Sequence, residues 1–226
     1  MIGANVERVL EAAEKAANKS GRSLEDITII GVTKNVEPAR IRELIRAGIT
    51  NIGENRVQEF LPKYEVLKDE KCTFHFIGHL QRNKVKFVTD KVEYIHSVDS
   101  LPLAKEINQR ANGKKVKILL EINLAEETTK IGVLPKNIYD TLEELTGYPF
   151  LKLVGLMCIP PMVVNPENNR RYFESLRKIF VDIKGKFLYY ADMKHLSMGM
   201  TGDFTVAIEE GATMVRIGSG FFGERL

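Results

Sequence analysis

The chain has 226 residues, 44% of them hydrophobic and 28% charged, a composition that argues against a disordered or fibrous protein. Its 33 basic and 30 acidic residues give a net charge of only +3, scattered along the chain, so we expect no nucleic-acid and no membrane partner. Two cysteines without CxxC spacing, no signal peptide and no apolar run of about 18 residues predict a cytoplasmic protein. Its length fits one domain over residues 1–226.

The chain opens with a predicted helix. Apolar residues at helical spacing run from Val6 to Ala17, and Ser20 and Gly21 end the pattern. The next segment, 27–34 (ITIIGVTK), is short, rich in β-branched residues and apolar on both faces. This pattern is typical of a strand in a parallel sheet that helices cover on both sides.

Strands and helices then alternate to the end of the chain. We expect the later strands at 51–54, 74–78, 94–98, 117–123, 153–159, 195–198 and 214–218. We expect helices between them at 38–47, 56–67, 83–89, 101–111, 135–146, 166–184 and 203–210. Eight strands in this alternation predict an α/β fold, a single (β/α)8 TIM barrel with an extra N-terminal helix. An open doubly wound sheet is the alternative, but it usually has fewer strands and a clearer glycine fingerprint after the first.

Lys34 stands at the end of the first predicted strand. Ile30, Val32 and Lys34 share one strand face, so the ammonium projects at the barrel mouth if that face is inward. Position alone favours a solvated lysine at a strand end. The functional alternative is a Schiff-base lysine, whose amine must be held near a carbonyl carbon.

Arg216 lies in the last predicted strand, MVRIG. Val215 and Ile217 suit the helix-facing side, which turns Arg216 toward the barrel interior, and a buried guanidinium needs partners. Because strand 8 of a closed barrel lies beside strand 1, Lys34 and Arg216 are expected around one anionic or heteroaromatic ligand. A structural ion pair between Arg216 and a glutamate such as Glu121 is the alternative.

Two glycine-containing loops fall where barrels often bind phosphate, after strands 7 and 8. The string GSGFFG at 218–223 formally matches GxGxxG, but too few residues follow it to build a dinucleotide site. As a loop, Gly218 and Ser219 could instead aim backbone N–H groups at a phosphate. The preceding turn, SMGMTGD at 197–203, leads into a helix with Thr201 as its candidate N-cap and forms a second candidate anion cradle.

Other polar residues give weaker signals. His96, Ser97 and Asp99 resemble parts of a triad, but neighbouring strand residues face opposite ways and no nucleophile elbow is present. His75 and His79 lack a third ligand, so we expect no metal site. Asn55 follows the second strand, where it is equally suited to touch a ligand or to cap a turn.

Seven strings together resemble the pyridoxal-phosphate homeostasis protein family over nearly the whole chain and in the family's order. They are GVTK (31–34), IGENRVQE (52–59), HFIGHLQRNK (75–84), HSVD (96–99), GLMCIPP (155–161), LSMGMTGDF (196–204) and VRIGSGFFG (215–223). The resemblance implies a fold-type III barrel like the N-terminal domain of bacterial alanine racemase. It also implies pyridoxal 5′-phosphate bound as an aldimine on Lys34, with Arg216 near the pyridine nitrogen and Asn55 close to the cofactor. The implied phosphate-binding residues are Ser197, Thr201, Gly218 and Ser219.

The resemblance implies a protein that buffers pyridoxal phosphate and supplies it to dependent apoenzymes, as a monomer or weak dimer and without robust turnover of its own. An amino-acid racemase is the alternative. Two-base racemisation needs an acid/base on each face of the aldimine, and the chain ends at Leu226 with no second base evident after the barrel. A phosphosugar-binding barrel enzyme without cofactor is a third, weaker reading.

Overall fold

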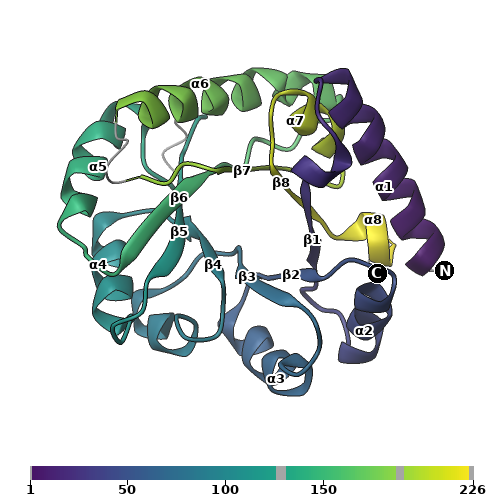
Figure 1. The fold of residues 1–226 in the computed structure, drawn as a ribbon, viewed down its shortest axis with the longest axis horizontal. Helices are drawn as coiled ribbons and strands as arrows, with labels where there is room; N and C mark the ends of the chain where they lie inside the picture. The colour runs from purple at the N-terminus through teal and green to yellow at the C-terminus, as the bar shows by residue number, and fades with distance from the viewer. Residues whose placement is uncertain (1, 126–130, 187–190, 224–226) are drawn as a thin grey trace.

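The computed structural model describes residues 2–125, 131–186 and 191–223. Its strands are all parallel and close into a barrel in the order β1-β2-β3-β4-β5-β6-β7-β8, with the helices outside (Figure 1). The strands are β1 (Thr28–Val32), β2 (Asn51–Glu54), β3 (Thr73–Phe76), β4 (Tyr94–Val98), β5 (Val116–Glu121), β6 (Leu151–Met157), β7 (His195–Met200) and β8 (Met214–Ile217). The predicted barrel is confirmed.

The outer layer contains α-helices and short 3-10 helices. The α-helices are α1 (Ile2–Lys19), α2 (Pro38–Arg46), α3 (Val57–Leu67), α4 (Leu101–Arg110), α5 (Ile138–Thr146), α6 (Arg170–Lys186), α7 (Phe204–Glu209) and α8 (Ser219–Phe222). The 3-10 helices are η1 (Leu24–Asp26), η2 (Arg82–Phe87), η3 (Pro135–Asn137) and η4 (Pro166–Asn169). Among the described helices, none is both long and apolar enough to cross a membrane.

Two local predictions differ from the structure. The helix expected at 83–89 is the 3-10 helix η2, in keeping with the three-residue spacing of its buried Val85 and the following buried Val88. The glycine-rich segment expected only as a loop after strand 8 contains the single turn α8. Both segments are too short for hydrophobic periodicity to distinguish a helix type.

The strands bury apolar residues on both faces, as the sequence predicts. Inside the barrel, Ile30, Leu119, Val154, Met157 and Met214 form a small cluster. On the outer face, alternate residues such as Ile29 of β1 and Val215 of β8 belong to the much larger core under the helices. Because this apolar cluster fills the barrel interior, polar side chains are confined to the ends of the strands and to a few buried positions between them.

The closure of the barrel brings the segment that carries Lys34 next to the strand that carries Arg216. Strand β1 pairs with β8 in parallel, with Ile30 opposite Arg216. The extra helix α1 lies along α7 and α8 beside this seam (Figure 1). Its Asn5 side chain donates a hydrogen bond of 2.7 Å to the carbonyl of Phe221 in α8. The N-terminal helix thereby holds the segment that follows β8 and borders the site.

Candidate functional site

A cavity of about 540 Å³ opens at the C-terminal ends of the strands. It is lined by Val32, Lys34, Asn55, Ile77, Ile159, Met200, Thr201, Gly202, Arg216, Gly218 and Ser219. Six of the seven site residues predicted from the sequence lie on its wall, and Ser197 does not. Its volume is in the range of small-molecule sites in proteins.

Lys34 lies in a turn beyond β1, because the strand ends at Val32 rather than at the lysine itself. Its side chain is exposed at the cavity. The next residue, Asn35, has a φ of +54°, a left-handed conformation that asparagine tolerates better than most residues. The backbone N–H of Asn35 donates a 2.7 Å hydrogen bond to Glu59 Oε2 of α3, which fixes this turn from one side.

A buried ion pair fixes the same turn from the other side. Lys63 Nζ of α3 lies 2.7 Å from the carbonyl oxygen of Thr33 and 2.7 Å from Glu54 Oε1 at the end of β2. The Thr33 hydroxyl donates to the same oxygen of Glu54. Sequence reasoning missed this cluster, whose one visible signal is the helical spacing of Glu59 and Lys63. The cluster holds Lys34 in place without touching its amine.

Arg216 is 4% exposed and faces the barrel interior, as its strand pattern predicts. Its Nη1 donates to the carbonyl oxygen of Ser197 at 2.8 Å and to Ser197 Oγ at 2.6 Å. Its Nη2 donates to the carbonyl oxygen of Cys158 at 2.9 Å. Burial lowers the pKa of the guanidinium, an effect that Cys158, Glu121 and Asp203 oppose. Among the described residues no carboxylate forms an ion pair with Arg216, so the ion pair with Glu121 considered above is not formed.

Ser197 lies deeper in the barrel interior and is not one of the residues that line the cavity. It is fully buried on β7, where its hydroxyl accepts from Arg216 and lies 2.9 Å from His96 Nδ1. A phosphate contact through this side chain therefore does not fit the structure, because the hydroxyl is already occupied inside the barrel.

Thr201 has a different role from the predicted helix cap. Asp203 precedes α7 as its N-cap residue, and its carboxylate accepts from the N–H of Met200 at 2.7 Å. Thr201 Oγ1 instead accepts from the N–H of Gly218 at 3.1 Å and from that of Gly220 at 3.4 Å. The Gly218 N–H is thus already paired, whereas the threonine hydroxyl proton and the exposed Ser219 side chain remain at the cavity. The two loops predicted as anion cradles are therefore hydrogen-bonded to each other through Thr201.

Asn55 follows β2 and carries an unpaired polar atom. Its Oδ1 is buried without a hydrogen-bond partner, although the residue lines the cavity. The loop after β3 presses on its backbone, since a Cβ on Gly78 would lie 2.1 Å from the Asn55 carbonyl oxygen. Glycine at 78 is therefore required by this close approach. Buried polar atoms without a partner are rare in proteins, so Asn55 is a candidate ligand contact on the cavity wall.

The weaker polar candidates do not form sites. His96 Nδ1 contacts Ser197, whereas the Ser97 hydroxyl donates to the carbonyl of Gly78, so the predicted absence of a triad agrees with their contacts. His79 does not pair with His75 but lies 3.1 Å from Asp99. In the part of the chain that the structure describes, no group of three potential ligands could hold a metal.

Comparison with known proteins identifies the family of this chain. Residues 4–226 match the family model for the alanine racemase N-terminal domain. The pyridoxal phosphate homeostasis protein of Aquifex aeolicus is 48% identical over 220 residues, which cover 96% of each chain. The chain belongs to the pyridoxal phosphate homeostasis protein family. The family resemblance predicted from the sequence strings is confirmed.

A further curated relative and two solved structures extend the comparison. The pyridoxal phosphate homeostasis protein of Escherichia coli K12 is 35% identical over 99% of this chain and 97% of its own. The structure of PipY from Synechococcus elongatus with PLP bound superposes with a TM-score of 0.82 at 32% identity, over 94% of this chain and 100% of that one. The alanine racemase of Corynebacterium glutamicum shares only the fold, with a TM-score of 0.66 at 13% identity, over 97% of this chain and 61% of that one.

Proposed function

We propose that this chain binds pyridoxal 5′-phosphate in the cavity, carries it covalently on Lys34, and takes part in pyridoxal phosphate homeostasis in the cytoplasm. The observation that supports this best is that an exposed lysine and a buried arginine, Lys34 and Arg216, open onto one cavity of suitable size. PipY, whose structure contains PLP, is a relative at 32% identity. In this function the protein buffers a reactive aldehyde and supplies it to dependent apoenzymes, as a monomer or weak dimer.

The cavity offers a group for each part of this cofactor. The Lys34 amine adds to the aldehyde carbon, water leaves and a C=N bond forms, which hydrolysis or another amine reverses. Arg216 has N–H donors left for the ring nitrogen, and a donor there keeps the ring unprotonated and a weak electron sink. Thr201, Gly218 and Ser219 border the end assigned to the phosphate, and Asn55 lines the same space.

The side chains of the cavity favour a carrier over a racemase. Racemisation needs one proton acceptor or donor on each face of the bound amino acid. Among the described residues lining the cavity, Lys34 is the one amine, and there is no tyrosine, histidine, cysteine or carboxylate. We therefore propose that turnover is absent or marginal. Sustained loss of the optical activity of L-alanine, at a rate on the order of the ~10 s⁻¹ median for enzymes, would contradict the carrier function and favour the racemase alternative.

The test is the visible absorption spectrum of the purified protein before and after borohydride reduction, followed by peptide mass mapping. We expect the wild type to be coloured and the reduced adduct to lie on Lys34. Lys34→Ala should lose the imine band completely, and Lys84→Ala, which changes a lysine of the neighbouring pocket, should keep it. A colourless protein that takes up no pyridoxal phosphate would contradict the proposal and favour the phosphosugar reading. An adduct mainly on Lys84 would contradict the assignment of Lys34.

A further inference from the structure

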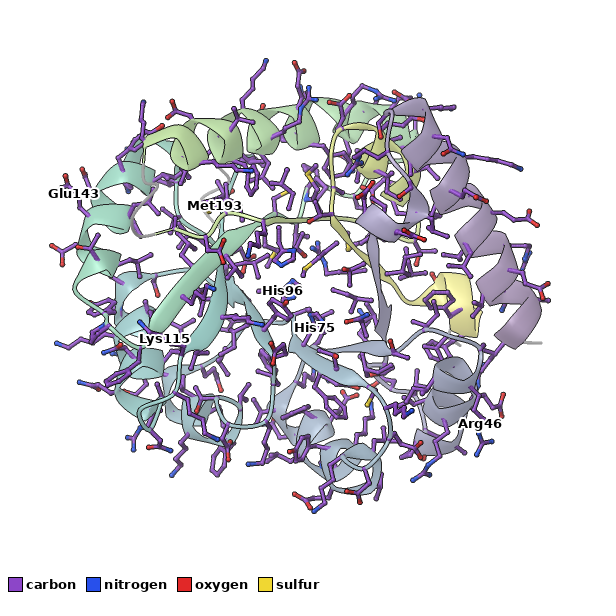
Figure 2. The ribbon with its side chains drawn as sticks, viewed as in Figure 1. Arg46, His75, His96, Lys115, Glu143 and Met193 are labelled. Carbon is purple, nitrogen blue, oxygen red and sulfur yellow. The ribbon has the colours of Figure 1, made fainter. Side chains whose placement is uncertain are left out.

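A continuous chain of hydrogen bonds crosses the barrel interior below Arg216. Arg216 Nη1 lies 2.6 Å from Ser197 Oγ, which lies 2.9 Å from His96 Nδ1. His96 Nε2 lies 2.9 Å from His75 Nδ1, and His75 Nε2 lies 3.0 Å from Asn51 Oδ1. Ser197, His96 and His75 are at most 1% exposed. Figure 2 shows both histidine rings in the middle of the barrel, and the chain joins residues of β8, β7, β4, β3 and β2.

The proton positions along this chain follow from its last member, because the amide oxygen Asn51 Oδ1 only accepts. A neutral His75 therefore carries its proton on Nε2, and its Nδ1 accepts from His96 Nε2. A neutral His96 then has no proton on Nδ1, so it accepts from the Ser197 hydroxyl, whose oxygen accepts from Arg216. Both rings are thus expected in the same tautomer, and every link points away from Arg216.

The surroundings keep both rings neutral. Burial lowers the pKa of His75 to about 3, with a further contribution from His195. Burial also lowers the pKa of His96 well below its ordinary value, helped by His75, Arg216 and His195. The other aromatic neighbour is Tyr94, whose ring stacks on His75 at a centroid distance of 4.9 Å. A proton added to His75 Nδ1 would point at the Nε2 proton of His96, so the chain requires a neutral His75.

We propose that Ser197, His96 and His75 are positioning residues that hold Arg216 in one orientation and so direct its remaining donors to the cavity. Arg216 has five N–H donors, and three hydrogen bonds hold it to β7 and to Cys158. The donors left over serve a ligand acceptor. The effect on the cofactor ring rests on the proposed function, whereas the proton positions are a property of the chain alone.

The first test needs no cofactor. The sequence has only 4 histidines, so nitrogen-15 NMR of histidine-labelled apoprotein can resolve each ring, with single substitutions as assignments. We expect His75 and His96 to carry the proton on Nε2 and to stay neutral from about pH 5 to about pH 9, across the usual histidine range. Ser197→Ala should shift the Nδ1 signal of His96. A proton on Nδ1 of either ring, or titration of either ring in this range, would overturn the chain.

The second test uses a matched pair of buried serines. Ser197→Ala removes a member of the chain, whereas Ser97→Ala removes a hydroxyl of similar burial that bonds to the Gly78 carbonyl instead. With pyridoxal phosphate, Ser197→Ala should bind about 2- to 10-fold more weakly and show a changed pH profile of its imine band. Ser97→Ala should keep the wild-type profile. Equal changes in both variants, or none in Ser197→Ala, would overturn the positioning role.

The two tests separate this inference from the proposed function. If the wild type forms no imine, the proposed function fails, and NMR of the apoprotein still decides the proton positions. If the wild type forms the imine but the tautomers differ from those expected, the proposed function stands and the positioning chain fails. A Ser197→Ala variant that does not fold leaves the wild-type tautomers as the deciding result.

Discussion

Two buried glutamates end strands on different sides of the barrel mouth, and only one of them has a cation. Glu54 ends β2 and lies 2.7 Å from Lys63 Nζ. Glu121 ends β5 and is 7% exposed, and no described residue forms an ion pair with it. Burial raises the pKa of Glu121 to about 7, with Asp99 adding to the rise and Arg216 opposing it.

The difference shows two ways to bury a carboxyl group. On the β2 side a charged carboxylate is useful, because Lys63 bridges it to the Thr33 carbonyl and so fixes the turn that carries Lys34. On the β5 side no described cation pairs with Glu121, and burial raises its pKa, which favours the neutral acid over an unpaired charge.

The largest expected effect comes from breaking the ion pair. Lys63→Met keeps most of the side-chain volume but leaves Glu54 buried without its cation, which should lower the free energy of unfolding by about 3–5 kcal/mol. Urea denaturation measures the change. The double variant Glu54→Gln/Lys63→Met should recover part of the loss, because it buries no unpaired charge. Wild-type stability of the single variant would contradict the role of the pair.

The unpaired acid should make stability depend on pH. A folded-state pKa of about 7, above the ordinary 4.5, means that the folded protein retains a proton that the unfolded chain has lost. Its contribution to stability is therefore full below about pH 4.5 and is lost as the pH rises to about 7, by about 3 kcal/mol. Glu121→Gln cannot ionise, so it should be more stable than the wild type at pH 8 and similar at pH 4. Parallel pH profiles of the two proteins would show that Glu121 does not titrate in this way.

Arg216 is the positive group that opposes the raised pKa of Glu121, so removing it should act on both the acid and the ligand. Arg216→Met keeps most of the volume and should still fold. It should lose about 1–3 kcal/mol of pyridoxal phosphate binding, because the donor to the ring nitrogen is gone. It should also move the loss of stability assigned to Glu121 to higher pH. Titrations followed by imine absorbance measure the affinity, and an unchanged value would remove Arg216 from the site.

The framework of this barrel could be predicted from local sequence patterns. The sequence predicts the strands at 51–54 and 94–98 with the observed bounds, from the alternation of short apolar segments with helical patterns. The inward direction of Arg216 followed from the alternation of β8, and its nearness to Lys34 from the closure of the barrel. These features depend on the period of a strand and on the order of strands.

The contacts within the site could not be predicted in the same way. The bond between His96 and Ser197 joins residues 101 positions apart, and no sequence pattern indicates which buried hydroxyl faces which ring. The same holds for Thr201, whose hydroxyl could cap a helix, bind a phosphate or, as observed, accept from Gly218. Short polar side chains have several partners within reach, and packing decides among them.

The smallest expected effect concerns Glu59, which holds the Lys34 turn from its more exposed side. Glu59 Oε2 accepts from the N–H of Asn35 and lies 3.5 Å from Lys63 Nζ, but the Glu59 side chain is 23% exposed, so water can replace part of what it supplies. Glu59→Ala should lower the free energy of unfolding by about 1 kcal/mol, and Glu59→Gln, which keeps an oxygen acceptor, by less. Because Asn35 must stay in a left-handed conformation, Glu59→Ala should also weaken imine formation at Lys34 relative to Glu59→Gln. Equal imine formation in the two variants, measured by absorbance at matched pyridoxal phosphate concentration, would show that the Lys63 side alone holds the turn.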